Sequence, residues 1–166
     1  MKNLTIENEV IIRDYKKDDW AAIERIHDCA RKVELEHAGL EAAFLPLKIA
    51  AERENLMDYE GLFVAECDQM VAGFLACTEE ELAWLYVGPE FMRRGIGRKL
   101  SRHALSAFPD IRYVEVLKGN EPAKNLYESL GFRVVGIEKG AMPGNEKFAV
   151  EVYSMERKNA ACEAKG

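Results

Sequence analysis

A short basic segment that contains two close glycines is a candidate site for chemistry. Arg93, Arg94 and Arg98 lie within six positions of one another, together with Gly95 and Gly97. An apolar stretch typical of a buried strand precedes the segment, and a pattern typical of a helix follows it. Backbone N–H groups at a helix start have no internal partner, and glycine leaves room for a phosphate to approach them. Because cations at a helix start are unfavourable unless an anion joins them, the segment predicts a pyrophosphate site.

Other glycine motifs fit this segment poorly. The chain has no Gly-x-Gly-x-x-Gly pattern for a dinucleotide, and residues 97–101 lack the spacing of a Gly-x-x-x-x-Gly-Lys-[Ser/Thr] loop. Nucleotide hydrolysis is therefore not expected. From the glycines alone, a purely structural interpretation is open, in which they shape a tight turn and the arginines solvate a helix face. The strand before the segment and the helix after it favour the anion site.

The basic segment resembles the coenzyme loop of the GNAT superfamily of N-acetyltransferases, which has the form [Gln/Arg]-x-x-Gly-x-[Gly/Ala] after a central strand. Residues 92–97, Met-Arg-Arg-Gly-Ile-Gly, match this form except at Met92. Residues 119–132 are similar to the second coenzyme segment of the family, and residues 71–74 fit its hairpin. The resemblance covers residues 10–157, and the branch that it matches best in motif acetylates ribosomal-protein N-termini.

The resemblance implies an N-acetyltransferase that transfers the acetyl group of acetyl-CoA to a primary amine by direct attack on the thioester. The amine could belong to a peptide, a protein N-terminus or a small molecule. A non-catalytic acyl-CoA-binding regulatory module of the same fold is the alternative. The residues expected at the coenzyme are Leu85, Tyr86, Val87, Met92, Arg93, Arg94, Gly95, Ile96, Gly97, Arg98, Asn120 and Asn125.

Two residues are predicted to carry the proton transfers. By resemblance, Tyr127 faces the coenzyme sulfur as the acid, and its phenol is a donor at neutral pH. An ordinary core tyrosine is the alternative. Glu115 lies in the otherwise apolar segment 111–117 and is the candidate base for the ammonium proton, directly or through a water molecule. An outward-facing glutamate that only meets solvent is equally compatible with the pattern.

The elements that must position these residues form an α/β (α+β) domain. Apolar periodicity predicts strands at 10–14, 61–66, 69–78, 82–87, 111–117, 132–138 and 147–156, with a turn at 67–68. It predicts helices after Asp18, over 35–56 with a break at Pro46, over 95–108, and from Pro122 to Gly131. The strand at 82–87 is apolar at nearly every position and is expected to be buried on both faces. By resemblance, the sheet is mixed, mostly antiparallel, splayed between the fourth and fifth strands and flanked by helices.

Composition limits the classes of protein that fit. At 166 residues and 48% hydrophobic content, the chain suits one domain, expected over 1–158, with a disordered tail at 159–166. A net charge of -6 disfavours nucleic-acid binding and suits a cationic partner. The sequence shows no membrane segment, signal peptide or metal-ligand spacing, so we expect a cytoplasmic protein without metal, as a monomer or homodimer. The amine acceptor is expected against residues 29–56 and the loop 140–146.

Overall fold

A computed structural model describes residues 9–158 of the chain. Residues 1–8 and 159–166 lie outside the described part, and the tail predicted at 159–166 falls there. The strands are β1 (Val10–Asp14), β2 (Gly61–Cys67), β3 (Met70–Cys77), β4 (Glu81–Val87), β5 (Tyr113–Leu117), β6 (Arg133–Met142) and β7 (Asn145–Glu156). The α-helices are α1 (Trp20–His37), α2 (Leu47–Arg53), α3 (Ile96–Ala107) and α4 (Glu121–Ser129).

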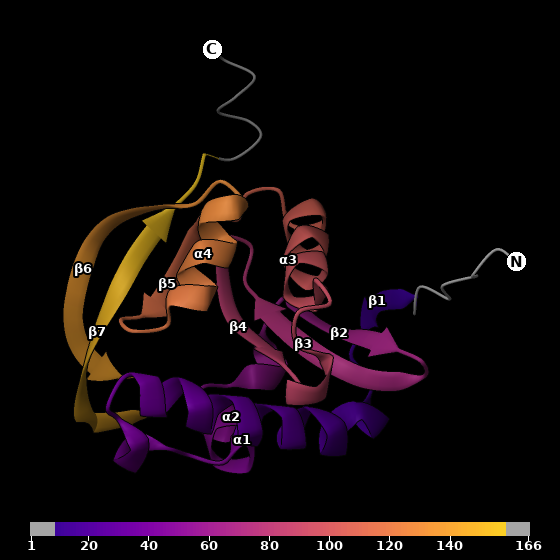
Figure 1. The fold of residues 1–166 in the computed structure, drawn as a ribbon, viewed down its shortest axis with the longest axis horizontal. Coiled ribbons are helices and arrows are strands. Elements are labelled where there is room, and N and C mark those ends of the chain that lie inside the picture. Colours follow the sequence, from indigo (N-terminus) through magenta and orange to yellow (C-terminus); the bar gives the residue numbers. More distant parts are fainter. Residues whose placement is uncertain (1–8, 159–166) are drawn as a thin grey trace, which may run out of the picture.

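The strands form one seven-stranded sheet in the order β1-β2-β3-β4-β5-β7-β6 (Figure 1). Neighbouring strands run antiparallel except β4 and β5, which run parallel. This arrangement confirms the mixed, mostly antiparallel α/β sheet that the sequence predicted.

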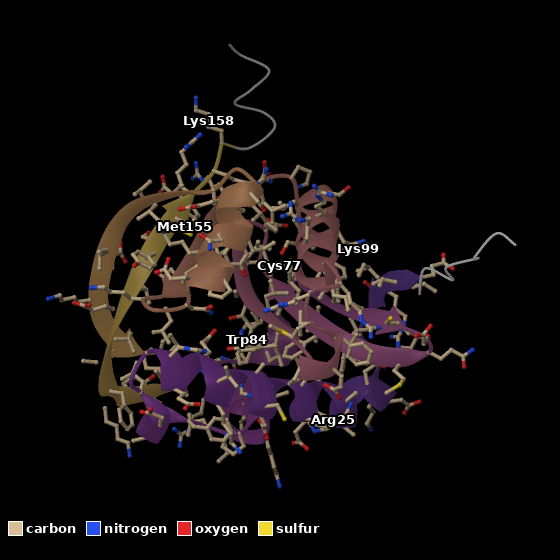
Figure 2. All side chains as sticks on the ribbon, in the orientation of Figure 1. Arg25, Cys77, Trp84, Lys99, Met155 and Lys158 are labelled. Carbon is tan, nitrogen blue, oxygen red and sulfur yellow. The ribbon has the colours of Figure 1, made fainter. Side chains whose placement is uncertain are left out.

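Helices cover both faces of the sheet, and each face has its own apolar cluster (Figure 1). Leu100 of α3 belongs to one cluster, which extends below α4. Ile23 of α1 and Leu47 of α2 belong to the other. Figure 2 shows one residue of each cluster, with Met155 on the α4 side and Trp84 on the α1 side. The central strands are therefore packed from both sides.

The two central strands separate soon after they begin. β4 and β5 pair only at Glu81↔Tyr113 and at Leu82↔Val114. The rest of β4, up to Val87, has β3 as its single neighbour. This confirms the predicted splay between the fourth and fifth strands and leaves one edge of β4 free.

A β-bulge marks the point of separation. Leu82 and Trp84 pair with consecutive residues of β3, so Ala83 has no partner there. The extra residue shifts the alternation: Leu82 packs in the α3-side cluster and Trp84 in the α1-side cluster. Ala83 is exposed and residues 85–87 are only half-buried. The prediction that the whole strand is buried on both faces was therefore wrong, because its second half lines an opening.

The first helices differ from the prediction in their limits. Asp19, not Asp18, is the N-cap of α1, and it makes no side-chain bond to the helix. Its carboxylate instead accepts two hydrogen bonds from Arg13, at 2.8 and 2.9 Å. The helix predicted over 35–56 begins inside α1, and Pro46 does interrupt it as the N-cap of α2.

Two turns also differ from the prediction. The hairpin between β2 and β3 turns at Asp68 and Gln69, both left-handed (φ 51° and 64°), rather than at Cys67 and Asp68. Left-handed residues at both central positions match the twist of a two-residue hairpin. β6 and β7 are longer than predicted, so the loop expected at 140–146 shortens to residues 143–144.

Candidate active site

The basic glycine loop connects β4 to α3 and has an uncommon backbone. Phe91 ends a short 3-10 turn (Pro89–Phe91), and its buried side chain anchors the loop. Arg93 (φ 64°) and Gly95 (φ 73°) both adopt left-handed conformations. For a residue with a side chain, this conformation costs about 1–2 kcal/mol. Turns of this kind form concavities of backbone N–H groups that bind anions.

The backbone amides of the loop are available for a ligand. Within residues 9–158, no N–H group from Arg93 to Arg98 donates a hydrogen bond to the protein. The first amide of α3 with an acceptor is that of Lys99, which donates to Gly95 O at 3.0 Å. The free amides lie at the positive end of the α3 dipole. This is the geometry that a phosphate group requires.

The arginine side chains of the loop form no ion pairs with the described residues. Met92, Arg93 and Arg94 are exposed and Arg98 is half-buried, whereas Ile96 is 2% exposed and fixes α3 to the sheet. The Arg94 guanidinium lies 5.6 Å from the centre of the Phe91 ring. Among the described residues, none forms an ion pair with these arginines. A bound anion would supply the missing charge.

Gly97 keeps open the space between α3, α4 and β4. A Cβ atom at this position would stand 3.4 Å from Leu126 Cδ2 and 3.8 Å from the side chains of Leu85 and Val87. A single methyl group would fit, but a longer side chain would fill the space. Gly97 therefore faces the end of β4, from which β5 has already separated.

The three residues predicted at the end of β4 point to different sides of the sheet. Leu85 and Val87 pack in the α3-side cluster, and Tyr86 packs in the α1-side cluster. Burial raises the pKa of the Tyr86 phenol. Because β5 has already diverged, the backbone of these residues borders the opening. A ligand with amide groups could therefore pair with β4 as a strand would.

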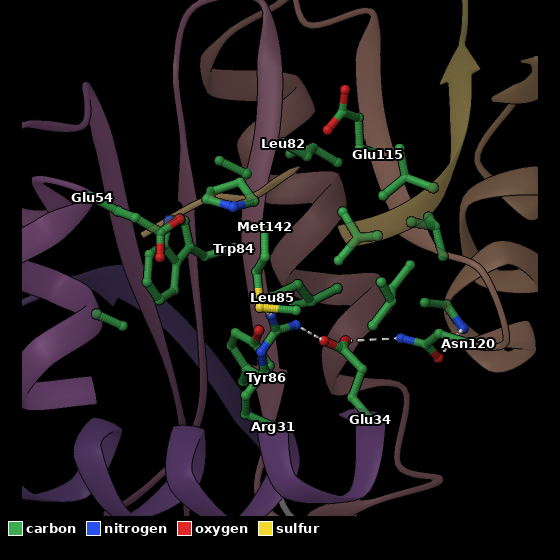
Figure 3. A pocket seen from close by; sticks show the side chains of 18 of the residues that line it. Arg31, Glu34, Glu54, Leu82, Trp84, Leu85, Tyr86, Glu115, Asn120 and Met142 are labelled. Carbon is green, nitrogen blue, oxygen red and sulfur yellow. Dashed lines mark hydrogen bonds and ion pairs between the residues drawn. The ribbon is translucent and has the colours of Figure 1, made fainter. Parts of the chain in front are cut away.

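A cavity of about 410 Å³ lies at the opening, on the α1 side of the sheet (Figure 3). Its wall is formed by α1, α2, α4, β4, β5, the end of β6 and β7. Four carboxylates line it, those of Glu34, Glu54, Glu81 and Glu115, against one guanidinium, that of Arg31. The cavity therefore favours a cationic ligand.

Tyr127 belongs to the wall of the cavity, as its predicted role requires. It is 6% exposed and its ring packs edge-on against Phe132, with the ring centres 5.8 Å apart. Burial raises the pKa of its phenol, and the carboxylate of Glu34 raises it further. The phenol is therefore neutral and a donor at neutral pH. Within the described chain, its hydroxyl makes no hydrogen bond.

Glu115 also lines the cavity, from the middle of β5. It is exposed and stands opposite Ser154 of β7. Val114 and Val116 on either side of it are buried, so Glu115 faces the α1 side of the sheet. Burial and the negative charge of Glu115 raise the pKa of Glu81 at the start of β4.

Asn120 forms hydrogen bonds to both sides of the cavity, to α1 and to α4. Its amide nitrogen donates to Glu34 Oε2 at 3.0 Å, and its oxygen accepts the backbone N–H of Ala123 at 3.4 Å as the N-cap of α4. Glu34 also pairs with Arg31, whose guanidinium reaches Met142 Sδ at 3.7 Å (Figure 3). Asn120 therefore links α1 to α4 across the opening. Its predicted contact with the coenzyme stays a prediction.

The sequence analysis missed the polar residues that α1 and α2 bring to the cavity, namely Arg31, Glu34 and Glu54. A signal for two of them exists, because His27, Arg31 and Glu34 recur at helical spacing on the side of α1 that carries Ile23. Polar side chains on a core-facing side indicate a site rather than a core. Glu54 follows the last residue of α2 and has no such periodic signal.

Other predicted features were placed as follows. Asn125 is exposed on α4 and does not line the cavity, so its coenzyme contact stays a prediction. Among residues 9–158, no group of three or more His, Cys, Asp or Glu side chains is placed to hold a metal ion. No helix in this part of the chain is long and apolar enough to span a membrane.

Comparisons with known proteins indicate the family of the chain. Residues 58–134 match the family model described as an acetyltransferase (GNAT) domain. The chain is 35% identical over 98 residues to the peptidyl-lysine N-acetyltransferase YjaB of Salmonella typhimurium, covering 56% of this chain and 67% of that protein. It is 36% identical over 74 residues to the peptidyl-lysine N-acetyltransferase YiaC of Escherichia coli, covering 44% of this chain and 50% of that protein.

A solved structure agrees over most of the chain. The ribosomal-protein-S18-alanine N-acetyltransferase of Escherichia coli superposes with a TM-score of 0.65 at 21% identity, covering 90% of this chain and 93% of that one. This likeness concerns the fold. The chain belongs to the GNAT acetyltransferase family. It spans half to two thirds of the length of the relatives named above.

Proposed function

We propose that this protein transfers the acetyl group of acetyl-CoA to a primary amine. The observation that carries the proposal is the opening between β4 and β5, which has free loop amides on the α3 side and an acidic cavity on the α1 side. An anionic donor and a cationic acceptor can thus reach one point from opposite faces of the sheet. The names of YjaB and YiaC, both peptidyl-lysine N-acetyltransferases, support a peptide amine as one candidate acceptor.

The residues present fit the coenzyme. The N–H groups from Arg93 to Arg98 would hold its pyrophosphate, with the arginine side chains neutralising the charge. The space beside Gly97 would admit the pantetheine arm, and the free edge of β4 would pair with its amides. The backbone N–H of Val87 would then polarise the thioester carbonyl. When bound, the coenzyme supplies an activated acetyl group.

The proposed reaction needs two proton movements. An alkyl ammonium group, with a pKa of about 10.4, must first lose a proton, which Glu115 or a water molecule beside it would take. The neutral nitrogen would then bond to the carbonyl carbon, and the carbon–sulfur bond would break with its electron pair on sulfur. Tyr127 would donate its proton to the leaving sulfur, and the second proton of the nitrogen would pass through water to the resulting phenolate, which restores Tyr127. The products are an N-acetyl amine and free coenzyme A.

Replacing Tyr127 by phenylalanine tests the function. Tyr127→Phe removes the donor at the leaving sulfur but keeps the ring packed on Phe132, so kcat should fall about 100-fold while the KM for acetyl-CoA changes little. The measurement is steady-state acetyl transfer to a panel of peptide and small amines. Tyr113→Phe, on β5 but outside the cavity, is the matched control and should keep full activity.

Two outcomes of this assay would contradict the proposal. If neither the wild-type protein nor the variant acetylates any amine although both bind acetyl-CoA, the regulatory module of the same fold is the better description. If Tyr127→Phe is as active as Tyr113→Phe, Tyr127 is a core residue. The cytoplasmic location and the monomeric or homodimeric state stay predictions.

A further inference from the structure

Three of the four cavity carboxylates, those of Glu54, Glu81 and Glu115, have no hydrogen-bond or ion-pair partner among the described residues, and Glu54 is the one that lies beside Trp84. Within residues 9–158 its carboxylate makes no hydrogen bond and no ion pair. Glu34, by comparison, is bonded to both Arg31 and Asn120. Every fully buried side-chain oxygen in this part of the chain has a hydrogen-bond partner. Because the oxygens of Glu54 have none, they must be accessible, and they face the cavity that Glu54 lines.

The cations near Glu54 are engaged elsewhere. Arg53, its neighbour in the chain, donates to Gly144 O at 2.8 Å and forms no ion pair with Glu54. Arg31 of α1 lowers the pKa of Glu54 from a distance but is paired with Glu34. The remaining charged neighbour is Glu146 of β7, which adds negative charge. Within residues 9–158, no cation therefore forms an ion pair with the Glu54 carboxylate.

Two aromatic residues line the cavity near the same carboxylate. Figure 3 shows Glu54 reaching from α2 to the indole of Trp84 on β4. Tyr59, whose phenol pKa is raised by burial and by nearby carboxylates including Glu54, lines the cavity as well. Aromatic faces attract cations, and they do so more strongly where water is excluded. An unpaired carboxylate beside aromatic rings is the combination that holds an ammonium group.

This corner of the cavity is separate from the predicted reacting end. In Figure 3, Glu54 and Glu115 lie on opposite sides of β4. Tyr127 responds electrostatically to Glu34 but not to Glu54. The ammonium group that reacts beside Glu115 and Tyr127 is therefore not the one that Glu54 would hold.

We propose that Glu54, with Trp84 and Tyr59, binds a second cationic group of the acceptor, so that the preferred substrate is an amine with two positive charges, such as a straight-chain diamine. This rests on the proposed acetyl transfer and names its substrate class. Burial and Glu146 raise the pKa of Glu54 to about 7, whereas Arg31 lowers it. A bound cation favours the ionised carboxylate, so selectivity for diamines should increase as the pH rises through 7.

The test compares diamines with monoamines of the same carbon number, over a series of chain lengths. In the wild-type protein, the best diamine should have a kcat/KM about ten- to a hundredfold above that of its monoamine, the range expected for one charged hydrogen bond. Glu54→Gln should remove this advantage through KM while leaving the monoamine constants within about twofold. Glu52→Gln, at an exposed position of α2 two residues before Glu54, is the control and should behave as wild type.

A binding measurement separates this inference from the proposed function. Calorimetric titration with the diamine should show wild-type binding that Glu54→Gln weakens about ten- to a hundredfold, whether or not turnover is detected. Equal kcat/KM for diamines and monoamines, or equal effects of Glu54→Gln on both, would overturn the second cation site while leaving acetyl transfer intact. Diamine binding without transfer to any amine would contradict the proposed function alone.

Discussion

The carboxylate of Glu54 illustrates how a binding residue can lower the stability of the fold. A buried acid without a partner disfavours its charged form, and burial is the main cause of its raised pKa of about 7. Well below pH 4.5 the carboxyl group is protonated in both the folded and unfolded states and costs nothing. As the pH rises, the unfolded chain ionises first, so the folded state loses relative stability until the folded group ionises as well.

Glu54→Gln should therefore stabilise the protein more at pH 8 than at pH 5. The amide keeps the shape of the side chain without the charge, and each kcal/mol gained should raise the melting temperature by about 2–4 °C for a domain of this size. Thermal melts of the wild type, Glu54→Gln and the control Glu52→Gln at both pH values measure this. A gain at pH 8 no larger than the gain at pH 5 would show that the carboxylate is well solvated.

Asn120 has a structural role in the fold, although the family resemblance predicts that it contacts the coenzyme. Both ends of its amide are in use, one as the N-cap of α4 and one toward Glu34. Capping is an ordinary role for an asparagine before a helix, and Asn120 has this role at the start of α4. The bond to Glu34 connects residues 86 positions apart, which no local pattern could indicate.

At the scale of the elements, the proposed coenzyme site at the start of α3 depends on one small residue, Gly97. Gly97→Leu should place a side chain among Leu126, Leu85 and Val87, in the space proposed for the pantetheine arm. Overpacking typically costs about 1–3 kcal/mol, so the KM for acetyl-CoA should rise about ten- to a hundredfold. Steady-state kinetics with varied acetyl-CoA measure this change.

The control for this variant is a glycine in open space. A Cβ atom added at Gly136 of β6 would meet no other atom within 4 Å, so Gly136→Ala should leave the KM for acetyl-CoA unchanged. An unchanged KM in Gly97→Leu, with a normal melting temperature, would place the coenzyme elsewhere on the fold.

The bulge in β4 shows why alternation alone misjudged the central strand. Without an extra residue, Leu82 and Trp84 would face the same side of the sheet, whereas Ala83 shifts them to opposite sides. The nearly continuous apolar run at 82–87 reflects packing on both faces over a short distance. It contains no sign that β5 leaves after Leu82.

At the scale of the whole molecule, the sheet separates the two proposed substrates. Free amides and arginines lie at the start of α3, and carboxylates gather under α1 and α2. The opening between β4 and β5 joins the two sides. A ligand that bridges the loop and the free strand edge should tie α3 and β4 together and oppose unfolding.

Acetyl-CoA should accordingly raise the melting temperature of the wild-type protein. At a ligand concentration of about 100 times Kd, linkage adds about 2.7 kcal/mol, which corresponds to a rise of about 5–10 °C. Differential scanning fluorimetry with acetyl-CoA measures the shift, and Gly97→Leu should show a smaller one at the same concentration. A melting temperature that does not respond to saturating acetyl-CoA would argue against any coenzyme site in the fold.

The sequence by itself determined the features whose signals are local. The basic glycine loop and the α4 segment that ends at the left-handed Gly131 each depend on residues a few positions apart, whereas the role predicted for Tyr127 came from the family resemblance. Short-range geometry and helix dipoles act within single segments, so composition and spacing record them.

Only the tertiary structure decided the acceptor cavity. Glu34, Glu54 and Glu115 come from α1, the end of α2 and β5, and they share one cavity because the sheet brings those elements together. The Arg53–Gly144 hydrogen bond, which engages the cation next to Glu54, joins residues 91 positions apart. Burial, and with it the charge preference of the cavity, is a property of the packed molecule, so no segment of the chain carries it alone.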